Sequence, residues 1–174
     1  MSVNTAMLST GSGEWQTPRR VFQKLDDEFH FRLDAAATAA NALCEYFYTA
    51  EDSAFDHDWA AELIDGIPGK LTGLSVPASN AVFLNPPYQL CKEFMKKALE
   101  ESRKGITVVC LVAARMDTQW WHRYAMEADE IRILEGRVQF THPDKPQANS
   151  STFPSAVVIF RNHRNRPLFT VSKL

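Results

Sequence analysis

Two largely apolar runs, Ala81–Leu84 and Ile106–Val112, constrain the fold of this chain most strongly. Continuous apolar runs, unlike alternating ones, are typical of strands buried on both faces of a parallel sheet. Apolar residues at helical spacing predict helices over 18–29 and 90–103. Further strands are expected at 31–34, 45–48, 130–134 and, closing the sheet, 155–160. This alternation predicts a single-domain α/β fold with a doubly wound, mostly parallel sheet.

The composition is that of a globular domain: 45% of the 174 residues are hydrophobic and 23% are charged. The net charge of −2 means that a nucleic-acid partner would need a local basic face. The three cysteines, Cys44, Cys91 and Cys110, lack metal-ligand spacing, and Cys91 and Cys110 fall in apolar patterns typical of reduced core residues. Reduced cysteines predict a cytoplasmic protein, and their spacing predicts no metal site. No apolar run reaches membrane-spanning length.

The first apolar run leads directly into Asn85-Pro86-Pro87-Tyr88. Two prolines fix the backbone, and ligands of open α/β sheets bind at the carboxyl ends of the strands. The Asn85 side-chain carbonyl and a proline-fixed backbone carbonyl would form a pair of acceptors beside the Tyr88 ring. This pair suits a planar amine, either the exocyclic amino group of a base or an amide nitrogen. The competing interpretation is a plain proline turn with Tyr88 on the surface.

Acidic residues follow the first two predicted strands. Asp34 ends the first strand and precedes a run of small residues that would let the backbone approach a ligand, although no glycine fingerprint is present. After the second strand, Glu51 or Asp52 is a candidate for binding ribose hydroxyls. Asp58 beside Trp59 is a candidate for holding an adenine. The alternative for these later acids is a solvated acidic loop.

The segment before the first helix has its own signals. Residues 1–13 lack periodicity and predict a flexible arm ahead of a domain over 14–174. Thr17 is expected to be the N-cap of the helix, with Pro18 at its first position. Trp15 would either anchor the core or form a wall of a cofactor site.

With these blocks in place, the chain resembles the small DNA N-6-adenine methyltransferases of bacteriophages and prophages. The resemblance covers nearly the whole chain, through the blocks Glu14–Pro18, Leu33–Ala36, Tyr46–Asp52, Asp58–Trp59, Asn85–Tyr88, Ala114–Thr118 and Phe153–Val158. It implies a Rossmann-like sheet with an antiparallel seventh strand. It also implies S-adenosylmethionine as the methyl donor and double-stranded DNA as the substrate, with direct transfer to the 6-amino group of a flipped-out adenine.

The resemblance also implies roles for single residues. The target base would be held by Asn85, Pro86, Pro87 and Tyr88. The cofactor would be held by Trp15, Thr17, Pro18, Asp34, Ala35, Asp52, Asp58 and Trp59, of which Asp58 and Trp59 contact its adenine.

Candidates for DNA contact are Arg115, which follows the second apolar run, Lys145 in the expected loop 141–152, and the basic tail 161–166. An ion pair of Arg115 with Asp117 is the alternative for that residue. Two other functions remain open: methylation of another amino nitrogen, in RNA or a protein glutamine, and a non-catalytic nucleic-acid-binding relative.

Overall fold

The structure is a computed structural model, and it describes residues 16–64, 79–142, 145–150, 153–161 and 167–173, with only the backbone at 142 and 145–150. Its main sheet contains β1 (Leu33–Asp34), β2 (Tyr46–Phe47), β3 (Ala81–Leu84), β4 (Thr107–Ala113), β5 (Glu130–Leu134), β8 (Ser155–Phe160) and β9 (Leu168–Ser172). These seven strands lie in the order β2-β1-β3-β4-β8-β5-β9.

The pairing confirms the predicted mixed sheet. Strands β1, β2, β3 and β4 are parallel to one another, and β9 is parallel to β5. Strand β8 runs antiparallel to both of its neighbours, β4 and β5. The expected antiparallel strand is therefore present, but it lies inside the sheet rather than at its edge.

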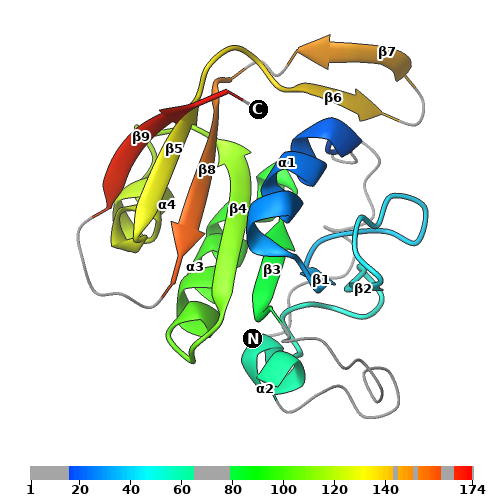
Figure 1. The fold of residues 1–174 in the computed structure, drawn as a ribbon, viewed down its shortest axis with the longest axis vertical. Coiled ribbons are helices and arrows are strands. Elements are labelled where there is room, and N and C mark those ends of the chain that lie inside the picture. Colours follow the sequence, from blue (N-terminus) through cyan, green and yellow to red (C-terminus); the bar gives the residue numbers. More distant parts are fainter. Residues whose placement is uncertain (1–15, 65–78, 143–144, 151–152, 162–166, 174) are drawn as a thin grey trace.

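Helices cover both faces of the sheet (Figure 1). On one face lies α1 (Arg19–Phe29), whose buried residues include Phe22 and Leu25. On the other lie α2 (Trp59–Ile64), α3 (Cys91–Ser102) and α4 (Gln119–Arg123). Alternate residues of β4 serve the two layers: Val109 packs with the α1 cluster, whereas Val108 packs with the opposite one. This arrangement is a three-layer α/β/α sandwich.

Four elements were not anticipated: one helix and three strands. The stretch 60–79, in which glycines and prolines predict an irregular connection, instead begins with most of helix α2, and its residues 65–78 are outside the described part of the chain. Strands β6 (Gln139–His142) and β7 (Lys145–Ser150) form an antiparallel hairpin where a polar loop was expected. Strand β9 extends the sheet beyond the expected basic tail. In Figure 1 the hairpin lies beyond the carboxyl ends of β3 and β4.

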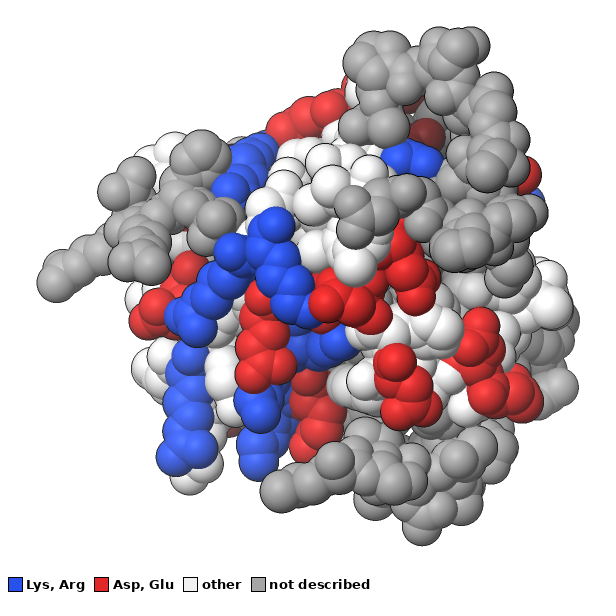
Figure 2. All heavy atoms as spheres, turned by 90° about the horizontal axis from the view of Figure 1, so that it is seen from below, with Lys and Arg blue, Asp and Glu red and all other residues white. Residues whose placement is uncertain are grey.

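The amino ends of the strands carry a network of paired charges. Figure 2 views the molecule from this side and shows Lys and Arg interleaved with Asp and Glu on the left, and mainly acidic groups on the right. Arg132 binds both oxygens of Glu28, at 2.6 and 2.7 Å, and also contacts Glu130 at 2.8 Å. Arg161, the first residue of the basic tail that was a candidate for DNA contact, pairs with Glu130 at 3.2 Å. The mixed charges on this side favour the opposite side for a nucleic acid.

Candidate functional site

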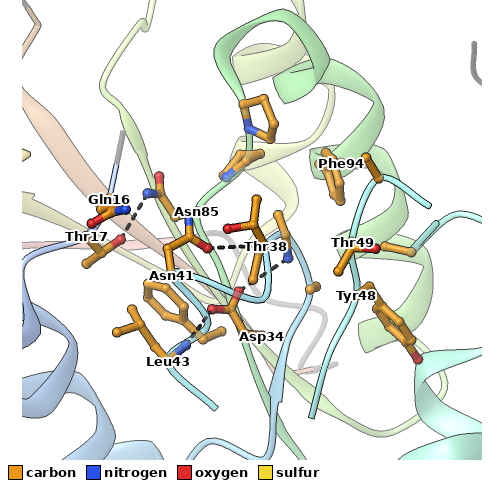
Figure 3. Close-up of a pocket in the computed structure, with 18 of the residues that line it drawn as sticks. Gln16, Thr17, Asp34, Thr38, Asn41, Leu43, Tyr48, Thr49, Asn85 and Phe94 are labelled. Carbon is orange, nitrogen blue, oxygen red and sulfur yellow. Dashed lines mark hydrogen bonds between the residues drawn. The ribbon is translucent and has the colours of Figure 1, made fainter. Parts of the chain in front are cut away.

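A cavity of about 520 Å³ opens at the carboxyl ends of β1, β2 and β3. Its lining comes from the loops that follow these strands, from α3, and from the hairpin residue Phe140. Figure 3 shows polar side chains on one side of it and Tyr48, Thr49 and Phe94 on the other. The lining includes two acidic residues, one amide and three aromatic rings: Asp34, Glu51, Asn85, Tyr48, Phe55 and Tyr88.

Asn85 follows β3 directly and is held by a residue from the start of the described chain. Its Nδ2 donates to Thr17 Oγ1 at 2.9 Å (Figure 3). Thr17 was expected to cap α1, and that expectation is wrong, because Pro18 occupies the cap position and no side chain caps the helix. Since an amide is planar, the bond at Nδ2 turns the Asn85 oxygen away from Thr17.

The rest of the motif forms a rigid rim. Pro86 is buried, Pro87 is half-buried, and both line the cavity beside Asn85. The Pro87 carbonyl accepts from the Leu90 N–H at 3.0 Å and starts the short 3-10 helix Tyr88–Leu90, which leads into α3. Half of Tyr88 is exposed at the cavity edge. A large aromatic ring left half-exposed beside a cavity is available to a ligand rather than to the core.

Asp34 is a carboxylate buried in the cavity wall, with 3% of its surface exposed. Its oxygens accept from the Ala36 N–H at 3.3 Å and the Leu43 N–H at 3.2 Å (Figure 3). Burial raises the pKa of this carboxyl to about 6, although the two N–H bonds act to lower it. No Lys, Arg or His of the described segments forms an ion pair with it, so the site holds a buried carboxylate suited to a cationic ligand. Ala35, beside it, also lines the cavity.

The turn after β2 separates its two acidic residues. The Thr49 hydroxyl accepts from the N–H groups of Glu51 at 3.2 Å and Asp52 at 3.1 Å. Glu51 lines the cavity. Asp52, one of the two candidates for binding ribose, instead bonds His57 at 2.7 Å and lies outside the lining. The geometry therefore favours Glu51 as the acid that faces a ligand.

The structure does not bring Asp58 and Trp59 to the cavity. Trp59 is fully buried, and its indole N–H donates to the Ala54 carbonyl at 2.8 Å. Asp58 pairs with Lys104 at 2.9 Å at the start of α2. The aromatic residues that do line the cavity here are Phe55 and Phe94, whose rings lie 4.5 Å apart.

Sequence reasoning missed this aromatic pair because the conspicuous Asp58-Trp59 signal lies only three residues beyond Phe55. The helical spacing that placed Phe94 on a buried face could not show that its ring also reaches a cavity.

The predicted DNA contacts are placed as follows. Arg115 lies just beyond β4, pairs with Asp117 at 3.5 Å, and stacks over the exposed Phe153 ring at 5.0 Å. Its ion pair is therefore present, and at 3.5 Å between exposed groups it leaves Arg115 accessible. Lys145 begins β7 in the part described by its backbone alone, and Trp15 falls outside the described residues. Pro18 is half-buried and does not line the cavity.

In the described segments, His, Cys, Asp and Glu do not gather in groups of three or more that could hold a metal ion. None of the helices in those segments has both the length and the apolar character needed to span a bilayer.

Comparison with known proteins now adds to this geometry. Residues 4–174 match the family described as DNA N-6-adenine-methyltransferase (Dam). The chain belongs to the Dam family. Membership confirms the resemblance inferred from the motifs and implies a methyl donor.

Two relatives are similar to parts of this Dam-family chain. The DNA N-6-adenine-methyltransferase of Escherichia phage T1 is 32% identical over 122 residues, which are 70% of this chain and 44% of that protein. A protein of Escherichia coli (strain K12) named "Putative methyltransferase YfdM" is 36% identical over 76 residues, which are 43% of this chain and 70% of that protein. The chain thus spans less than half of the phage T1 protein.

Proposed function

We propose that this Dam-family chain transfers a methyl group from S-adenosylmethionine to the 6-amino group of adenine in double-stranded DNA. The observation that carries the proposal is the position of the Asn85 amide. It follows β3 directly, its orientation is set by the bond to Thr17, and it lines the same cavity as the buried carboxylate of Asp34. An oriented amide oxygen beside a fixed proline carbonyl suits an exocyclic amino group. The family match supports adenine in DNA over the RNA, protein-glutamine and non-catalytic alternatives.

The cavity residues fit the methyl donor. Asp34 supplies the negative charge that an ammonium or sulfonium group requires. Glu51 supplies acceptors for ribose hydroxyls, and Phe55 with Phe94 supplies apolar surface for an adenine ring. When bound, S-adenosylmethionine supplies an electrophilic methyl group, and the protein needs only to hold it beside the acceptor nitrogen.

Asn85 and Pro86 then act on the target base. Their two oxygens accept the two hydrogens of its amino group, which draws the nitrogen toward a tetrahedral shape and directs its lone pair at the methyl group. A preorganised contact of this kind contributes about 3–4 kcal/mol to the transition state, and alignment of the reacting atoms contributes further. Tyr88 stacks on the base, which is worth roughly 1–3 kcal/mol.

The duplex would lie against the carboxyl edge, with the target base flipped out, because stacking otherwise hides its amino group. Exposed side chains gather around this edge: Tyr88, Arg115 and Phe153. Arg115 supplies a cation for a phosphate, and Phe153 supplies an apolar surface for a base. The three free cysteine thiols support a cytoplasmic setting.

The test is Asn85→Ala. The rate of methyl transfer to DNA should fall by at least about 100-fold, which is the loss expected for one preorganised group. The dissociation constant of S-adenosylmethionine, measured by calorimetry, should stay within about twofold of wild type, because the donor is held mainly by other residues. Transfer at the wild-type rate in this variant would refute the proposed role of Asn85.

A further inference from the structure

His57 lies beside Tyr48, outside the cavity lining, and joins two parts of the chain. Its Nε2 lies 2.7 Å from Asp52 Oδ1 in the turn after β2, and its Nδ1 lies 2.7 Å from Glu62 Oε1 on α2. Its ring stacks on Tyr48 with centroids 4.5 Å apart and an angle of 19°. Tyr48 in turn bonds Glu62 through its hydroxyl. One imidazole therefore connects Tyr48 and the turn after β2 with α2.

The turn held by this bridge also carries the residues that line the cavity. Thr49 N–H donates to the Asp52 carbonyl at 3.1 Å, which closes the turn and directs Asp52 and Glu51 to different surroundings. Asp52 reaches His57, whereas Glu51 and, a few residues later, Phe55 reach the cavity. Residues 49–56, named here the donor loop, are thus tied to α2 through Asp52 and His57, in addition to the Trp59 bond to the Ala54 carbonyl.

The bridge requires a protonated imidazole. Both ring nitrogens face carboxylate oxygens, so both must carry hydrogens for both bonds to form. Partial burial lowers the pKa of His57, but the bonds and charges of Asp52 and Glu62 outweigh burial and raise it above 6.5. Once the ring is neutral, one nitrogen lone pair faces a carboxylate, and one bond is lost.

The other groups around His57 come from the neighbouring elements. Just after β2, the Tyr48 hydroxyl stays protonated, because burial and Glu62 raise its pKa. On α3, Lys97 donates to the His57 backbone carbonyl at 2.6 Å and pairs with Glu101 at 2.7 Å. The Lys97 ammonium thus binds the His57 backbone carbonyl and Glu101 rather than the imidazole ring. The protonated ring is stabilised by Asp52 and Glu62.

We propose that protonated His57 is a positioning residue that fixes the donor loop against α2, so that binding of the methyl donor weakens as His57 deprotonates. The inference rests on the proposed function of the cavity as the donor site. It predicts two limbs in the pH dependence of donor affinity. On the acid side, affinity falls as Asp34 gains a proton near pH 6; on the alkaline side, it falls as His57 loses its proton above pH 6.5.

The experiment measures the dissociation constants of S-adenosylmethionine and S-adenosylhomocysteine by calorimetry across this pH range and beyond, for wild type and His57→Gln. Wild type should lose affinity by about tenfold across the alkaline limb, the cost of one lost hydrogen bond to a charged group. His57→Gln should already bind about tenfold more weakly at neutral pH, with the alkaline limb absent. The KM for the donor should rise while kcat changes little, because His57 does not touch the reacting atoms.

His122 offers a matched control, because it is an exposed histidine on α4 outside the cavity lining. His122→Gln should keep both limbs of the wild-type profile. Asp52→Asn weakens the same bridge while His57 stays in place. This variant tests the positioning role of His57 even if His57→Gln does not fold. It should lower the pKa of His57, measured by NMR, and weaken donor binding.

The outcomes separate the two claims. If His57→Gln and Asp52→Asn fold and retain the wild-type alkaline limb, the positioning role of His57 is refuted, while donor binding itself stands. If wild type binds neither S-adenosylmethionine nor S-adenosylhomocysteine at any pH, the proposed function is refuted instead.

Discussion

Replacing Asp34 with asparagine should stabilise the protein at alkaline pH and weaken its binding of the donor. The Asp34 carboxyl is buried, and its pKa is raised from 3.8 to about 6. Each pKa unit corresponds to about 1.4 kcal/mol, so a buried ionised Asp34 lowers the free energy of unfolding by about 3 kcal/mol. Asparagine avoids this cost, because it carries no charge.

The sign of the effect depends on pH. An acid whose pKa is raised on folding binds more protons in the folded state, so stability falls as pH rises from about 4 to about 6 and stays lower above that. The substituted amide accepts only one of the two backbone N–H bonds well, which costs about 1–2 kcal/mol at every pH. The Asp34→Asn variant should therefore be less stable than wild type at pH 4 and more stable at pH 8, by about 1–2 kcal/mol in each case.

Thermal unfolding at pH 4 and pH 8 measures this crossover. For a chain of this size the expected differences are roughly 2–8 °C, with opposite signs at the two pH values. Calorimetry at pH 8 should show donor affinity reduced by about 10–100-fold, the loss of one charge-assisted bond. A variant that is less stable at both pH values would refute the cost assigned to the buried charge. Unchanged donor affinity would remove Asp34 from the donor site.

Two further substitutions test the base side of the site. Thr17→Val removes the acceptor that orients the Asn85 amide, so the rate of methyl transfer should fall about 10-fold or more. Thr17→Ser keeps the hydroxyl and should transfer methyl groups at nearly the wild-type rate. Equal rates in the two variants would exclude the orienting bond. Tyr88→Ala should raise the KM for DNA by about 5–100-fold, because stacking on the base is lost. Thermal stability should be nearly unchanged, because the ring is half exposed. A large drop in melting temperature would instead assign Tyr88 a structural role.

The strand ends that frame the site could be predicted from local patterns. The apolar runs at 81–84 and 106–112 are buried strands, and the positions of both Asp34 and Asn85 follow from the strands that they end. A strand buried on both faces needs apolar residues at almost every position. Such strands can therefore be recognised from the sequence alone.

The contacts that shape the site could not be predicted in this way. Thr17 and Asn85 are 68 positions apart, and the local rule for a Thr-Pro pair predicts a helix cap instead. Glu51 and Asp52 are adjacent, so only the folded turn shows which one faces the cavity. Trp59 was the predicted aromatic wall, and its bond to the Ala54 carbonyl shows that it belongs to the core instead.

The most direct test of the account is incubation of the purified protein with labelled S-adenosylmethionine and unmethylated duplex DNA, followed by nucleoside analysis of the DNA. The account predicts label in N-6-methyladenine. Label absent from the DNA, in a protein that still binds S-adenosylmethionine by calorimetry, would contradict the assignment of adenine in DNA as the substrate.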